Sequence, residues 1–237
     1  MIRILILFAL FTLSPVLSAN VHPTNNGVDR GQLTAKISPK ELLSKKILGK
    51  IKQYANHPDP KIVRLAVSGY AKLLKNGKIE AGSPLSIIDF SLPSSAERLW
   101  IIDTNNGDLL HQSLVSHGRN SGNLLAREFS NTNSSFMSSI GFYLTGETYQ
   151  GKHGYSLRLD GLEKGFNDNA RERAIVIHGA EYANRDFVAN TGRLGRSLGC
   201  PALPMDSYKE IIDTIKEGSC LFIYGQDDSY LKQSRLI

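Results

Sequence analysis

The chain of 237 residues is poor in cysteine and tryptophan, with only Cys200, Cys220 and one tryptophan. A disulfide-dense scaffold is therefore excluded, although a single bond between the two cysteines stays open for an exported protein. The sequence also lacks the Cys and His pairs of a structural zinc site, so we expect no metal. Basic residues outnumber acidic ones by 28 to 22. No basic cluster is interleaved with aromatic residues, which argues against a nucleic-acid partner.

Long apolar runs are missing everywhere except at the N-terminus. There, Arg3 gives a positive start, residues 4–13 are almost wholly apolar, and Ser14-Pro15 breaks the run. Small residues then lead to Ala19, which is the layout of a secretory signal peptide over residues 1–19. The run is shorter than the roughly 20 apolar residues that span a membrane; an uncleaved N-terminal anchor is the alternative. We expect export to the periplasm or cell envelope, with no transmembrane segment after cleavage.

The rest of the sequence has an ordinary globular composition, with 41% hydrophobic and 21% charged residues. This composition argues against a disordered chain, and the length supports one core with a small appendage. We divide it into a linker over residues 20–37, a helical segment over 38–78 and a main domain over 79–237. The modest positive excess suits anionic polymers or a membrane surface, or ordinary solubility.

Two helices are predicted in the segment 38–78. Ser38-Pro39 and Glu41 form a helix start with a capping Ser, Pro at the first position and Glu three residues after the cap. Apolar residues then recur at helical spacing as far as the stop signal at Asn56-His57-Pro58. A second helix is expected from Pro60 to Leu74, ending at Asn76-Gly77. The two helices predict a hairpin ahead of the main domain.

From about residue 79 the pattern changes to alternation and β-branched residues, which predicts an α+β class with mostly β structure. Thr104-Asn105-Asn106-Gly107 is a strong hairpin turn. Residues 117–137 are rich in Gly, Asn and Ser and are predicted to form a long surface loop. His117 in that loop and His153 are expected to be exposed and inert. The predicted strands are 85–90, 98–103, 109–116, 141–145, 155–159, 174–177 and 221–224, with an amphipathic helix over 207–216.

Two segments combine reactive side chains with glycine. In the first, His178 follows a short apolar strand and precedes Gly179, which lets another backbone or a substrate approach. In the second, Cys200 follows Gly199 in a turn that can present its sulfur and N–H groups toward one point. A thiol nucleophile needs a base and donors for an oxyanion. These segments supply both if their strands lie side by side, whereas Cys220 is typical of a buried strand.

The two segments resemble the YkuD-like L,D-transpeptidases. Their second motif usually reads Ser-His-Gly-Cys, where this chain has Ser197-Leu198-Gly199-Cys200. The similarity extends over roughly Leu85 to Tyr224 and includes Ser116-His117-Gly118 and Ser138-Ser139-Ile140-Gly141-Phe142. Leu198 replaces the motif His, and Pro201-Ala202 stands where many members have an apolar residue followed by Arg or Asn. The resemblance implies an L,D-transpeptidase-like catalytic domain over residues 79–237.

The resemblance also implies roles for individual residues. Cys200 would attack the third residue of a peptidoglycan stem peptide and expel the terminal D-alanine, with His178 as its base. The Gly179 carbonyl would hold the second nitrogen of the imidazole, and N–H groups around Gly199 and Cys200 would form the oxyanion hole. The candidate substrate-binding residues are Arg196, Ser197, Tyr155 and Tyr182.

Three outcomes stay open for the resulting thioester. An amine from a second stem gives a 3→3 cross-link or attaches another acceptor, and water gives an L,D-carboxypeptidase. A wall-binding module with a decayed site is the third alternative. No cofactor is implied, since acyl transfer by a thiolate needs none. We expect a monomer whose partners are peptidoglycan stem peptides and whose Cys200 is acylated by carbapenems.

Overall fold

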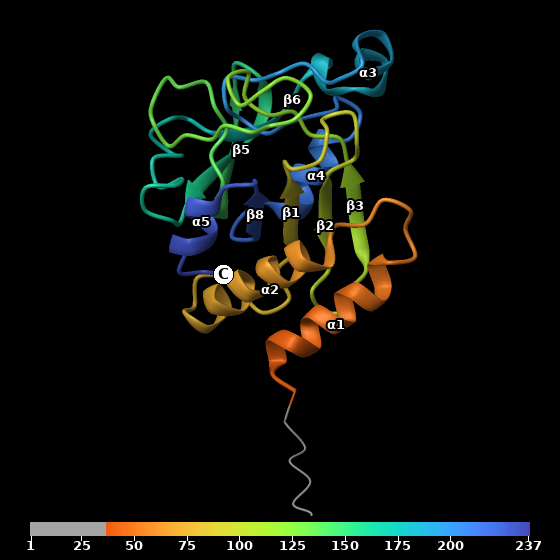
Figure 1. Cartoon of the computed structure of the whole chain (residues 1–237), viewed down its shortest axis with the longest axis vertical. Coiled ribbons are helices and arrows are strands. Elements are labelled where there is room, and N and C mark those ends of the chain that lie inside the picture. Colours follow the sequence, from red (N-terminus) through yellow and green to blue (C-terminus); the bar gives the residue numbers. More distant parts are fainter. Residues whose placement is uncertain (1–36) are drawn as a thin grey trace, which may run out of the picture. The chain divides into compact units, whose positions relative to one another are not determined.

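An eight-stranded mixed sheet forms the centre of residues 37–237, the part of the chain that the computed structural model describes (Figure 1). The predicted signal peptide and all of the predicted linker except Ile37 lie outside these residues. The strand order is β3-β2-β1-β8-β4-β5-β6-β7. The pairs β1–β8 and β6–β7 are parallel and the other pairs are antiparallel. The strands are β1 (Leu85–Asp89), β2 (Leu99–Ile102), β3 (Leu109–Ser113), β4 (Gly141–Gly151), β5 (Gly154–Gly161), β6 (Val176–Gly179), β7 (Ala202–Leu203) and β8 (Cys220–Tyr224).

The two predicted N-terminal helices are present as α1 (Pro39–Ile51) and α2 (Pro60–Lys75). The Ser38 hydroxyl accepts a hydrogen bond from the Glu41 N–H at 3.2 Å, as the capping pattern predicted. Helix α1 ends before the predicted stop at Asn56. The Asn56 carbonyl instead accepts a hydrogen bond from the Trp100 indole at 2.8 Å, which holds the connection against the sheet.

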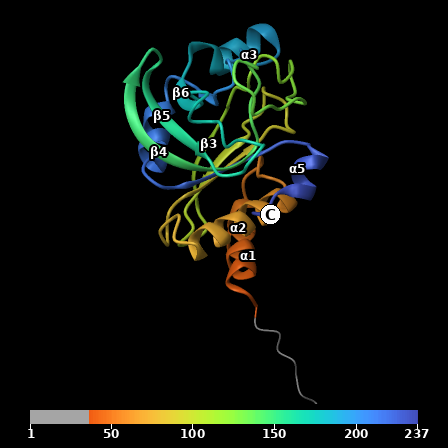
Figure 2. The ribbon, with the colours of Figure 1, turned by 90° about the vertical axis from the view of Figure 1, so that its left-hand side faces the viewer.

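Helices cover both faces of the sheet (Figures 1 and 2). On one face, Gly69 of α2 lies directly against the ring of Phe142 on β4. On the other face, α4 (Tyr208–Ile215) packs against β5 and β6, with the Tyr208 ring beside Gly179. The mixed α+β class is therefore confirmed. The short helices η1 (Glu181–Ala183), α3 (Arg185–Thr191) and α5 (Asp228–Gln233) were not predicted. None of the helices in residues 37–237 has the length and hydrophobicity to cross a membrane.

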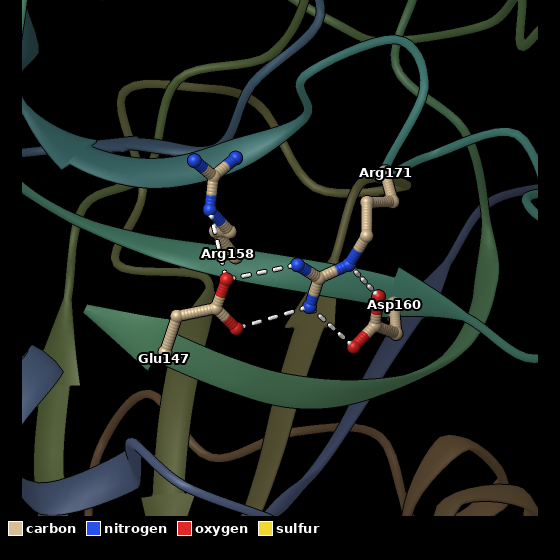
Figure 3. Close-up of polar contacts among 4 residues, drawn as sticks. All are labelled: Glu147, Arg158, Asp160 and Arg171. Atoms are coloured by element: carbon tan, nitrogen blue, oxygen red, sulfur yellow. Dashed lines mark hydrogen bonds and ion pairs between the residues drawn. The ribbon is translucent and has the colours of Figure 1, made fainter. Parts of the chain in front are cut away.

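The β4–β5 hairpin is longer than its sequence pattern suggested, because polar residues interrupt the alternation. The carboxylate of Glu147 pairs across the hairpin with Arg158 at 3.0 Å and with Arg171 at 2.9 Å (Figure 3). Arg171 also pairs with Asp160 of β5. These contacts tie the segment between β5 and β6 to the hairpin that it follows.

Two further predictions need correction: the bounds of the strand predicted over residues 174–177, and the surface loop predicted over residues 117–137. Strand β6 begins at Val176, because Ala174 has a φ of 53° and cannot extend it, and it includes His178. The loop 117–137 is not simply a surface loop, since His117 is fully buried. The backbone of His117 accepts a hydrogen bond from the Ser197 N–H at 3.0 Å, and this contact carries the start of the loop into the interior.

Candidate active site

His178 is held on a buried strand by pairing on both sides. It lies opposite Ser156 of β5 and Ala202 of β7. Its Nδ1 lies 2.8 Å from the Gly179 carbonyl oxygen. Because a carbonyl can only accept, Nδ1 carries the proton and Nε2 keeps a free lone pair. This is the contact that the resemblance implied for Gly179, and it leaves Nε2 able to act as a base.

Cys200 sits at the end of a tightly turned loop. Gly199 has a φ of 129°, and a side chain there would approach the Met137 carbonyl oxygen to 2.9 Å. The Ser197 hydroxyl spans the turn, since it accepts from the Gly199 N–H at 3.0 Å and donates to the Cys200 carbonyl at 2.6 Å. Ser197 therefore shapes the turn that presents the thiol.

The parallel pairing of β6 with β7 brings Cys200 beside the strand that carries His178. The His178 N–H donates to the Pro201 carbonyl at 3.4 Å. The Cys200 thiol donates to the Ala174 carbonyl, with Sγ at 3.6 Å from the oxygen. Both cysteines are free, so the open disulfide alternative is excluded. Cys220 is fully buried in β8, as its strand pattern predicted.

Burial sets the protonation of both groups. Loss of solvent lowers the pKa of His178 below its ordinary 6.5; the Gly179 hydrogen bond opposes this shift and the charge of His153 adds to it. Burial raises the pKa of the Cys200 thiol above 9.0, although the Val176 N–H and the charge of Arg173 act in the opposite direction. At neutral pH the resting site therefore contains a neutral thiol and a neutral imidazole, and the proton would move as the sulfur attacks.

The two N–H groups expected to form an oxyanion hole have different surroundings. The Gly199 N–H already donates to Ser197 within the turn. The Cys200 N–H lies near its own sulfur, where it lowers the pKa of the thiol. Within residues 37–237 this N–H has no acceptor at hydrogen-bond distance outside its own residue. It is the better placed of the two donors for an oxyanion on an attacked carbonyl.

The expected substrate-binding residues are only partly brought together. Tyr182 packs beside Gly195. Burial, and to a smaller extent negative charge on the nearby Cys200, raises the pKa of Tyr182 to about 12. Arg196 directs its Nη1 to the carbonyls of Arg119 and Gly122 at 3.2 and 3.1 Å. Tyr155 points to the face of the sheet that carries α4 and donates to Asp213 at 2.7 Å. By its register it lies on the face opposite to His178.

The motif position that lacks His is exposed. The Leu198 side chain is 58% exposed beside the buried Gly199. It therefore extends into solvent next to Cys200 and packs against little of the core.

The prediction that His117 is exposed is wrong, since it is fully buried. Its Nδ1 lies 2.8 Å from Nη2 of Arg98, which is also fully buried. Burial and the Arg98 charge lower the pKa of His117 to about 3, so the imidazole is neutral and accepts from the guanidinium. Arg98 in turn donates to the Val115 carbonyl at 2.9 Å. This pair supports the backbone on which Ser197 rests, and no local sequence pattern identified it.

His153 is exposed, as predicted. Its ring stacks on the ring of His178, with centroids 4.3 Å apart and an interplanar angle of 22°. The contact joins the turn between β4 and β5 to the imidazole of β6. No group of three His, Cys, Asp or Glu side chains in residues 37–237 has the arrangement of a metal site.

Comparison with known proteins gives one family. A family model described as an L,D-transpeptidase catalytic domain matches residues 54–224. No curated protein matches the chain.

Solved structures of L,D-transpeptidases give weak superpositions. The enzyme from Mycobacterium smegmatis has a TM-score of 0.38 and 13% identity, over 59% of this chain and 58% of that chain. The transpeptidase LdtMt1 in complex with imipenem has a TM-score of 0.36 and 16% identity, over 59% and 57% of the two chains. The enzyme from Stackebrandtia nassauensis has a TM-score of 0.38 and 11% identity, over 78% and 92%. The match thus spans less than two thirds of the first two structures.

Proposed function

This chain belongs to the family of L,D-transpeptidase catalytic domains, and from that premise we propose that it is an exported cysteine acyltransferase acting on peptidoglycan. The observation that carries the proposal is the placement of Cys200 in the turn that leads into β7, the strand paired with the His178 strand β6. The sulfur is free, and the imidazole is fixed with Nδ1 on the Gly179 carbonyl. A thiol beside an oriented imidazole is the arrangement of a cysteine nucleophile with its base.

The proposed reaction begins on a tetrapeptide stem. The Cys200 sulfur attacks the carbonyl carbon of the third residue while Nε2 of His178 takes the thiol proton. The Cys200 N–H stabilises the oxyanion; a donor of this kind contributes about 2.7–4 kcal/mol. His178 then protonates the departing nitrogen, and the C–N bond breaks to release D-alanine and leave a thioester.

The second half-reaction determines the product. An amine from another stem attacks the thioester, His178 accepts its proton, and the thiol is restored as a 3→3 cross-link forms. Another amine acceptor would be attached in the same way. Water in place of the amine would make the protein an L,D-carboxypeptidase.

Purified full-length protein incubated with tetrapeptide-stem muropeptides tests the proposal. Mass analysis should find free D-alanine and cross-linked dimers with wild type and with Cys220→Ala, and neither product with Cys200→Ala. Tripeptide without dimers would establish the hydrolytic alternative. If the folded wild-type protein forms no product at all, the enzyme proposal is contradicted and the wall-binding module is the remaining alternative.

Acylation by a carbapenem offers a second measurement on the same variants. We expect one covalent adduct on Cys200 in wild type and in Cys220→Ala, because Cys220 is fully buried. Cys200→Ala should carry none. An adduct that persists in Cys200→Ala would contradict the assignment of the nucleophile.

A further inference from the structure

Within residues 37–237, Arg173 is a cation without an anionic partner. Its Nη1 donates to the Ser130 carbonyl at 2.6 Å, and its Nη2 donates to the Met137 carbonyl at 2.7 Å and the Ser135 hydroxyl at 3.2 Å. All three acceptors are neutral. Arg158, Arg171 and Arg185 each pair with a carboxylate, whereas no carboxylate of residues 37–237 pairs with Arg173. The half-buried guanidinium therefore keeps an uncompensated charge.

This charge lies against the turn that carries the nucleophile. A Cβ on Gly199 would be 3.5 Å from Nη2 of Arg173 and 2.9 Å from the Met137 oxygen that Arg173 binds. The carbonyl oxygen of the next residue, Ala174, accepts a hydrogen bond from the Cys200 thiol, with Sγ 3.6 Å from the oxygen. Ala174 has a φ of 53°, a conformation that costs a non-glycine residue about 1–2 kcal/mol. The strained residue therefore follows the cation directly in the chain and contacts the sulfur through its carbonyl.

An uncompensated cation in a partly desolvated place strongly favours a nearby anion. Burial lowers the pKa of the Arg173 guanidinium, while negative charge on Tyr143, and less strongly on Cys200, would oppose that shift. Among the groups facing this cation, a Cys200 thiolate is the anion that the proposed reaction would generate. Tyr143, the other acidic group near Arg173, is fully buried and keeps its proton because burial raises its pKa.

We infer that Arg173 is a positioning residue for the nucleophile: it braces residues 130–137 against the Gly199 turn, and its charge stabilises negative charge on the Cys200 sulfur. The inference rests on the proposed role of Cys200 and adds the group that supports it. Its two parts are separable, because the brace depends on hydrogen bonds to carbonyls and the electrostatic effect depends on charge alone.

The rate of iodoacetamide alkylation of Cys200 as a function of pH tests the inference on the full chain. Mass analysis assigns the modified cysteine. In Arg173→Met the midpoint should rise by about one pH unit, which makes alkylation about tenfold slower below the midpoint. In Arg173→Lys, which keeps the charge, the midpoint should stay near that of wild type. The midpoint temperature of thermal unfolding should fall in both variants, because each loses contacts to residues 130–137.

Arg171→Met is the matched control, since that arginine lies two positions away and is already neutralised by Glu147 and Asp160. Its midpoint should equal that of wild type. If Arg173→Met does not fold, Arg173→Gln should show the same rise in midpoint. An unchanged midpoint in the neutral variant, or an equal rise in Arg173→Lys, overturns the inference. If the alkylation midpoints shift as expected but the wild-type protein converts no muropeptide, the proposed function is contradicted while the inference about Arg173 stands.

Discussion

His178 illustrates how contacts with two other residues fix the chemistry of a single side chain. The Gly179 carbonyl selects the tautomer, and the stacked ring of His153 adds a second titratable group at 4.3 Å. Burial and the His153 charge both disfavour the imidazolium. A base that stays neutral below pH 6.5 remains able to accept a proton in mildly acidic surroundings.

The His178 ring should therefore protonate with a midpoint below 6.5. His153→Phe keeps an aromatic ring in the stack but removes the positive charge, so the midpoint should move upward toward 6.5. NMR titration of the imidazole Cε1 protons measures both values, with His178→Gln for assignment. His57→Gln, remote in the chain from β6, serves as the control and should leave the midpoint unchanged. A midpoint above 6.5 in wild type would contradict this account.

At the scale of elements, the segment between β5 and β6 is held by contacts at both of its ends. Arg171 ties it to the β4–β5 hairpin, and Ala174 turns it into β6 with a left-handed backbone. Strain of this kind persists only where surrounding contacts over-determine the conformation. Here those contacts include the bond from the Ala174 N–H to the Arg171 carbonyl at 3.0 Å.

Ala174→Gly should stabilise the protein by roughly 0.5–1 kcal/mol, because glycine adopts a positive φ without the steric cost of a Cβ. Urea unfolding measures the change. Ala170→Gly is the matched control in the same segment, where a fully buried methyl group is lost and stability should fall. A loss of stability in Ala174→Gly would show that the alanine methyl matters more than the strain.

At the scale of the whole described chain, the helical pair and the sheet share one core. Apolar residues of α1 and α2 belong to the same buried cluster as those of β1 and β8. Helix α2 approaches closely because Gly69 leaves room for the ring of Phe142. The segment predicted as a separate helical hairpin is therefore part of the packing that holds the sheet.

Gly69→Ala should destabilise the protein by about 1–3 kcal/mol, because its Cβ would lie 2.1 Å from the Phe142 ring and force the helix away. Gly49→Ala is the control in α1, where no atom lies within 4 Å of an added Cβ. Its higher helix propensity should stabilise by up to about 1 kcal/mol. Thermal unfolding compares the two; equal effects would mean that α2 does not depend on this close approach.

The sequence by itself determined the features that depend on local chemistry. A capping pattern located α1, apolar spacing and the Asn76-Gly77 end located α2, alternation located most strands, and the glycine-flanked His178 and Cys200 indicated the reactive pair. Only the tertiary structure decided that His117 is buried on Arg98, that Arg173 faces the Cys200 turn and that Tyr155 lies on the opposite face. These placements depend on which distant segments pair in the sheet, and neither periodicity nor residue type along the chain encodes that pairing.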